Sequence, residues 1–76
     1  MQKIAFIGCG GIGRCHIDGI LKKKLSNFLI LIDSSQDSID QTISIIKQHE
    51  NFSDELRILT FKKIQDCTEQ IDYAVI

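Results

Sequence analysis

Short apolar runs alternate along this chain with longer segments in which apolar residues recur at helical spacing. The run FLILI at residues 28–32 is apolar throughout, as is typical of a parallel strand covered on both faces. Three further runs also predict strands. The predicted strands lie at residues 4–7, 28–32, 56–61 and 73–76.

The first segment between strands carries a helical stripe. Ile12, His16 and Ile20 recur at helical spacing, with two more apolar residues beside them, which predicts a helix over residues 11–24. Because His16 shares the stripe with two isoleucines, we expect it to pack in the core rather than to act as a catalytic base.

A second helix is predicted after residue 33. Ser34 and Asp37 form an S-x-x-D capping pattern, an apolar stripe follows, and the helix should stop near residues 49–51. Residues 62–70 predict only a short helix or a loop. The order β-α-β-α-β-(α)-β then predicts an α/β fold with a parallel sheet and right-handed crossovers.

Composition and charge narrow the function classes. The 76 residues carry nine Lys or Arg against ten Asp or Glu, a net charge of −1, so no surplus of cations predicts nucleic-acid binding. The longest apolar run is far too short to cross a membrane, and no targeting segment is recognisable. Three cysteines without a C-x-x-C pair suit reduced thiols, and we expect a cytoplasmic location.

All five glycines lie in residues 8–19, and four of them lie in GCGGIG, residues 8–13. This segment fits G-x-G-x-x-G between a predicted strand and a predicted helix, the context in which a dinucleotide binds. Gly8 would make the tight turn, Gly10 would let the backbone approach a pyrophosphate, and Gly13 would let the helix pack close to the strand. The backbone amides near Gly11 and Ile12, at the helix start, would face the anion.

Asp33 lies twenty residues beyond Gly13, at the end of the second predicted strand. A carboxylate there can accept hydrogen bonds from both hydroxyls of the adenine-side ribose, with Ser34 beside it as a further cofactor contact. The same carboxylate would repel a 2′-phosphate, and no Arg or Lys directly follows it. The prediction is therefore NAD rather than NADP. The competing interpretation is a glycine-rich turn followed by an Asp that only caps a helix.

No catalytic residue and no metal site are predicted. His49 and Cys67 have no partner at metal-ligand spacing. Since the last predicted strand reaches Ile76, we expect residues 1–76 to be a partial dinucleotide-binding domain, the N-terminal piece of a longer protein, with the substrate domain absent from this chain.

The segment IAFIGCGGIGRCH resembles the start of the glucose–fructose oxidoreductase/inositol dehydrogenase family (Gfo/Idh/MocA), in which G-x-G-x-x-G-x-x-H follows the first strand. The specific likeness covers residues 3–33. It implies a Rossmann-type domain in a two-domain oxidoreductase that moves hydride between nicotinamide and the hydroxyl of a sugar or cyclitol. The family's catalytic lysine and substrate-side histidines come after the fourth strand, so this chain alone should be inactive. Any homo-oligomer would form through the missing C-terminal domain.

Alternative functions share parts of this pattern. An S-adenosylmethionine-dependent methyltransferase usually has an acidic residue two positions before the first glycine and a glycine at the position of Ile12. This chain has Phe6 and Ile12 at those positions, so it meets neither requirement. A regulatory module that senses NAD or NADH without turnover uses the same cofactor-binding half, so the motif does not separate it from a dehydrogenase.

Overall fold

The computed structural model describes residues 3–8, 11–24 and 26–75, and for residues 11–15 it describes the backbone alone. The predicted order of elements is confirmed; Ile76, expected in the last strand, lies outside the described residues. The elements are β1 (Lys3–Ile7), α1 (Gly11–Lys23), β2 (Phe28–Ile32), α2 (Gln36–Gln48), β3 (Arg57–Phe61), the 3-10 helix η1 (Ile64–Asp66) and β4 (Tyr73–Val75).

The strands form one parallel sheet in the order β3-β2-β1-β4. The first crossovers step outward from β1 to β2 to β3, and the chain then returns to the other side of β1 with β4. This arrangement is that of a partial Rossmann-like α/β fold, as predicted. The order places the carboxyl ends of β1, β2 and β3 side by side at one edge of the sheet, where ligands of such folds bind.

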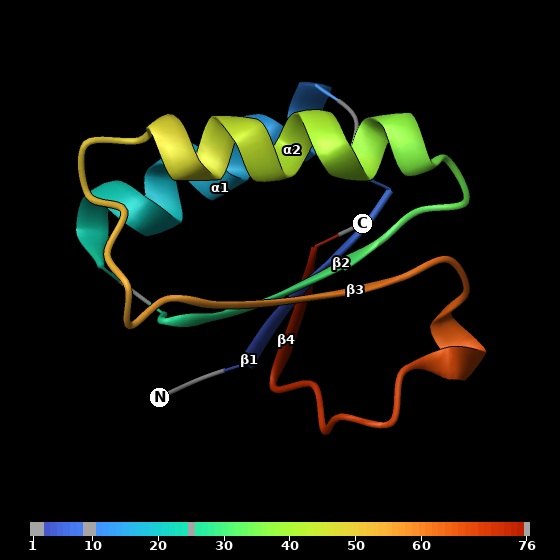
Figure 1. Ribbon diagram of the computed structural model, residues 1–76. Helices are drawn as coiled ribbons and strands as arrows, with labels where there is room; N and C mark the ends of the chain where they lie inside the picture. Colours follow the sequence, from blue (N-terminus) through green and yellow to red (C-terminus); the bar gives the residue numbers. More distant parts are fainter. Residues whose placement is uncertain (1–2, 9–10, 25, 76) are drawn as a thin grey trace.

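Both helices cover the same face of the sheet, as Figure 1 shows. Ile17, Ile20 and Leu21 of α1 and Ile46 of α2 are buried against side chains of β1 and β2 that point to this face. Burying an aliphatic side chain stabilises the fold by about 1.5–3 kcal/mol relative to leaving it exposed, so these contacts hold the helices on the sheet. The strand residues of this cluster are Ile4, Phe6, Leu29 and Leu31.

The opposite face is covered by the segment between β3 and β4, which carries η1 and lies below the sheet in Figure 1. Cys67 and Ile71 of this segment pack, half-buried, against the second cluster of strand residues. The coverage is thinner than on the helical face, because η1 is a single short turn without a buried residue. The buried members of the second cluster are Ala5, Phe28, Ile30 and Ile32.

His16 does not pack in the core; that prediction is wrong, because its side chain is exposed. The buried positions of α1 among residues 16–24 are Ile17, Ile20 and Leu21, which follow one another at spacings of three and one. The face that meets the sheet is therefore centred one position after His16, a rotation of about 100° around the helix.

The N-cap of α2 is Ser35 and not Ser34, one residue later than the capping pattern predicts. The Ser35 side chain accepts a hydrogen bond from the amide of Ser38 at 3.3 Å, and its own amide donates to Asp33 Oδ1 at 2.8 Å. The Asp33 carboxylate thus holds a turn over residues 33–35, and the helix begins after that turn.

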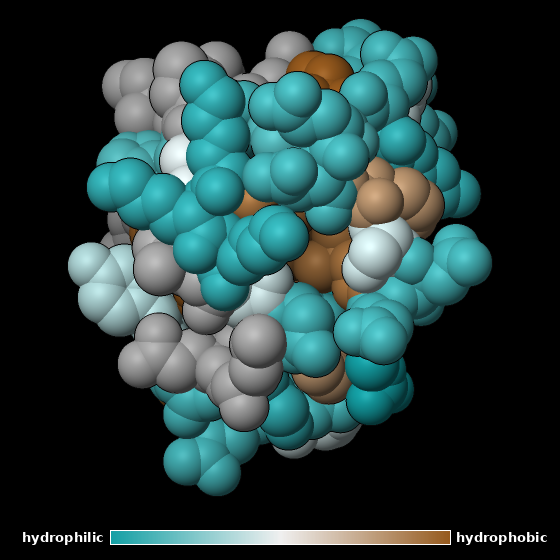
Figure 2. Space-filling view, turned by 90° about the vertical axis from the view of Figure 1, so that its left-hand side faces the viewer, coloured by the Kyte–Doolittle hydropathy of each residue, from teal (hydrophilic) through white to brown (hydrophobic). Residues whose placement is uncertain are grey.

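The surface in Figure 2 is mostly hydrophilic, with hydrophobic side chains visible only in small patches. None of the helices in the described part of the chain has the length and apolar character needed to span a bilayer.

Candidate functional site

The turn after β1 is made by Gly8, whose backbone adopts a φ of +87°. Residues with a Cβ rarely adopt this conformation. A Cβ added at this position would meet nothing within 4 Å, so it is the backbone angle, and not a neighbouring atom, that demands glycine. The Gly8 amide donates a 2.8 Å hydrogen bond to the carbonyl of Ile32, which ties the turn to the end of β2. The predicted turn-making role of Gly8 agrees with this geometry.

Asp33 follows β2 directly, half-buried at the same edge of the sheet. Its amide donates to the carbonyl of Phe61 at 3.1 Å, so Asp33 is also fixed against β3. The Ser35 amide donates to Asp33 Oδ1, and this bond holds the turn between β2 and α2. The turn-holding role that competes with ribose binding is thus present.

The start of α1 lies three residues beyond Gly8, since the helix begins at Gly11. The first amides of an α-helix have no partner within the helix and carry a partial positive charge, so they suit an anion. Gly11, Ile12 and Gly13 lie in this first turn as predicted, although their surroundings are not described. Gly10 lies outside the described residues.

An open pocket of about 290 Å³ lies where β1, β2 and β3 end. Three of the predicted cofactor-binding residues line it together: Gly8, Asp33 and Ser34. Ile7 and Ile32, the last residues of their strands, contribute apolar wall, so the pocket combines one carboxylate with aliphatic surface. This composition suits a ribose with an attached base.

Two residues of the pocket wall were not predicted from the sequence. Lys62 and Ile64 follow β3 and line the same pocket. Ile64 is 49% exposed, so its aliphatic side chain is open to solvent on the pocket wall. The sequence could have indicated these two residues through the predicted end of the third strand. Parallel strands that pair place the residues that follow them side by side.

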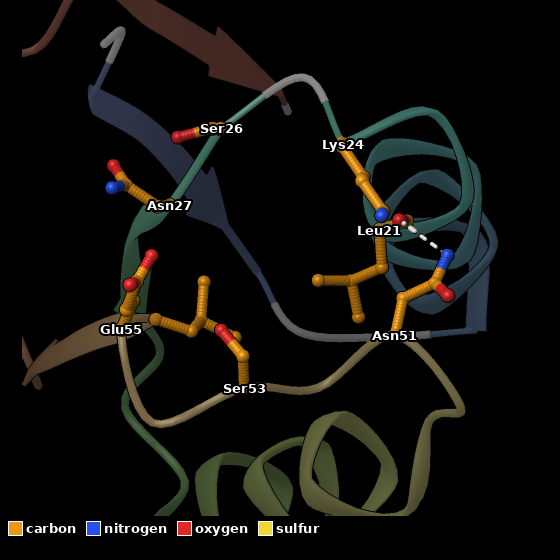
Figure 3. Close-up of a pocket in the computed structure, with 8 residues that line it drawn as sticks. Leu21, Lys24, Ser26, Asn27, Asn51, Ser53 and Glu55 are labelled. Atoms are coloured by element: carbon orange, nitrogen blue, oxygen red, sulfur yellow. Dashed lines mark hydrogen bonds between the residues drawn. The ribbon is translucent and has the colours of Figure 1, made fainter.

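A second pocket, of about 260 Å³, lies at the opposite edge of the sheet and is shown in Figure 3. Two of its polar side chains, those of Asn51 and Ser26, bind the backbone of the fold. Asn51 donates from Nδ2 to the carbonyl of Leu21 at 2.9 Å, the contact drawn in Figure 3, and so satisfies the end of α1. Ser26 exchanges two hydrogen bonds with the backbone of Phe28. We therefore assign this pocket a structural role rather than a role in ligand binding.

His49 forms a further polar contact away from the candidate site. His49 Nε2 lies 2.9 Å from Asp18 Oδ1, and this contact joins the end of α2 to α1. Among the side chains that the structure describes, no three from His, Cys, Asp or Glu gather closely enough to hold a metal ion.

Comparisons with known proteins do not assign the chain to a family. No family model matches it, and neither a curated protein nor a solved structure matches it.

Proposed function

We propose that this chain is the NAD-binding half of an oxidoreductase that transfers hydride between a nicotinamide cofactor and a sugar- or cyclitol-type alcohol. The observation that supports NAD binding is that Gly8 and Asp33 line one pocket at the carboxyl ends of β1 and β2. Helix α1 begins three residues after Gly8. The cofactor pyrophosphate would lie against the helix start, and the adenine-side ribose would lie on Asp33.

The oxidoreductase part rests on the resemblance of residues 3–33 to the Gfo/Idh/MocA family, and on nothing else. The residues that line the pocket offer a carboxylate, a hydroxyl, an ammonium and aliphatic surface. In this proposal they serve cofactor binding.

Calorimetric titration with NAD tests the binding proposal. Asp33→Asn keeps the size of the side chain and removes the charge, and it should weaken NAD binding about tenfold or more, the worth of a charge-assisted hydrogen bond. Asp37→Asn is the matched control, because it removes the same charge four residues away on an exposed part of α2. It should change affinity less than twofold. Absence of NAD binding at millimolar concentration, or an equal loss in both variants, would overturn the proposal.

The gene beyond Ile76 separates the dehydrogenase from the NAD(H)-sensing module. A reading frame that continues into a Glu-Lys-Pro-like strand end and a β-rich domain supports hydride transfer. A stop codon directly after Ile76, with NAD binding intact, would favour the sensor. The methyltransferase alternative has a structural objection as well, because Phe6, which stands in place of its acid, is fully buried in the core.

A further inference from the structure

Lys62 lies beside Asp33 although twenty-nine positions separate them in the sequence. Strands β2 and β3 pair in parallel with Ile32 opposite Phe61, and the bond from the Asp33 amide to the Phe61 carbonyl extends the pairing past the strand ends. The next residue of each strand is therefore at the same edge, and both side chains line one pocket.

Within the described part of the chain Lys62 takes part in no ion pair, and its side chain is exposed. Lys3, by contrast, is bound to Glu69 at 2.8 Å. Lys62 can therefore meet an anionic ligand without breaking an ion pair with any residue that the structure describes.

This placement changes the expected choice between NAD and NADP. The two cofactors differ by one phosphate on the 2′-oxygen of the adenosine ribose. Asp33 repels that phosphate, and an ammonium in the same pocket attracts it, so the two side chains act in opposite directions on one group. No Arg or Lys directly follows Asp33 in sequence, but Lys62 reaches the same pocket from the neighbouring strand.

We infer that Lys62 is a specificity-determining residue that lets the pocket accept the 2′-phosphate of NADP despite Asp33. The inference rests on the proposed dinucleotide binding and deepens it. The chain binds NADP within about tenfold of NAD, and Lys62 supplies the charge that keeps this difference small.

The test compares Lys62→Gln with Lys63→Gln by titration with NAD and with NADP. Lys63→Gln is the matched control, because it removes the same charge from the adjacent residue. Lys63 is also exposed, but it does not line the pocket. Lys62→Gln should weaken NADP binding about tenfold and change NAD binding less than twofold. Lys63→Gln should leave the ratio of the two affinities within twofold, and Lys62→Arg should retain NADP binding.

Each remaining outcome overturns the inference. If NAD binds in an Asp33-dependent way but NADP does not bind, or if both glutamine variants weaken NADP equally, Lys62 has no specific role while the proposed function stands. The same holds if Lys62→Gln weakens both cofactors equally, which would indicate contact with a group that they share. If neither cofactor binds the wild-type chain, the proposed function and the inference fail together. Melting temperatures of the variants verify that each is folded.

Discussion

The amide of Gly8 donates a 2.8 Å hydrogen bond to the carbonyl of Ile32, where β1 and β2 end beside each other. This bond holds the end of β1 against the end of β2. At the same residue the backbone turns left-handed, with a φ of +87°. The glycine at position 8 is therefore demanded by the backbone angle that follows the bond.

Gly8→Ala should lower the free energy of unfolding by about 1–2 kcal/mol, because alanine is strained at positive φ. Gly19→Ala is the matched control. Gly19 lies inside α1 and likewise has no atom within 4 Å of an added Cβ. It should raise stability by about 0.8–1 kcal/mol, since alanine favours a helix over glycine. Urea unfolding of both variants measures the difference, and changes of the same sign would contradict the backbone explanation.

Ile64→Ala should weaken NAD and NADP binding to the same extent, roughly fivefold. The half-exposed Ile64 side chain lines the candidate pocket. A bound base would bury part of its aliphatic surface, which contributes about 1 kcal/mol to the binding free energy. Ile45→Ala on α2 is the control, because Ile45 is 40% exposed but lies away from the pocket. Equal affinities for wild type and Ile64→Ala would show that no part of the cofactor covers Ile64.

The ion pair between Lys3 and Glu69 should stabilise the protein only above acid pH. The hydrogen bond and the charge of Lys3 hold the pKa of Glu69 below its ordinary value of 4.5. A carboxyl group with a depressed pKa in the folded state binds its proton more readily when the chain unfolds. Its contribution is therefore present above about pH 4.5 and is lost as the pH falls through the folded-state pKa.

A double-mutant cycle with Lys3→Met and Glu69→Gln measures this contribution. The cycle removes the other effects of Lys3, whose Nζ also lies 5.1 Å from the centre of the Phe28 ring. The coupling free energy should be favourable at pH 7 and should decrease as the pH falls below about 4.5, the ordinary pKa of a glutamate. A coupling that is the same above and below this pH would contradict the assignment.

His49 should carry its proton on Nε2 when neutral. Its Nδ1 accepts a hydrogen bond from the amide of Asn51 at 3.1 Å, so Nδ1 has no proton, and Nε2 is left to donate to Asp18 at 2.9 Å. Nitrogen-15 chemical shifts of the imidazole ring at neutral pH distinguish the two tautomers. A protonated Nδ1 in the neutral ring would be incompatible with the Asn51 contact. Asp18→Asn offers a second measurement, because it should change the Nε2 shift more than the Nδ1 shift.

Local sequence patterns predicted the bounds of those elements whose limits depend on their own residues. The apolar run FLILI predicted β2 with the bounds that the structure has, and the helical stripe predicted α1 to within one residue at its end. The patterns were less accurate at the boundary of α2. Ser34 and Ser35 are both competent caps, and the hydrogen bond from Ser35 to the Asp33 carboxylate decides between them.

The sequence by itself determined the alternation of strands and helices, the glycine turn and the acid that follows the second strand, because periodicity and glycine conformation act over a few residues. Only the tertiary structure decided that His16 faces solvent and that Lys62 lies beside Asp33. The rotation of a helix is set by the surface on which it packs, and the neighbours of a strand end are set by strand order. Both depend on contacts between segments far apart in the chain, and these contacts place a lysine in a pocket that residues 3–33 alone would have left with an acid.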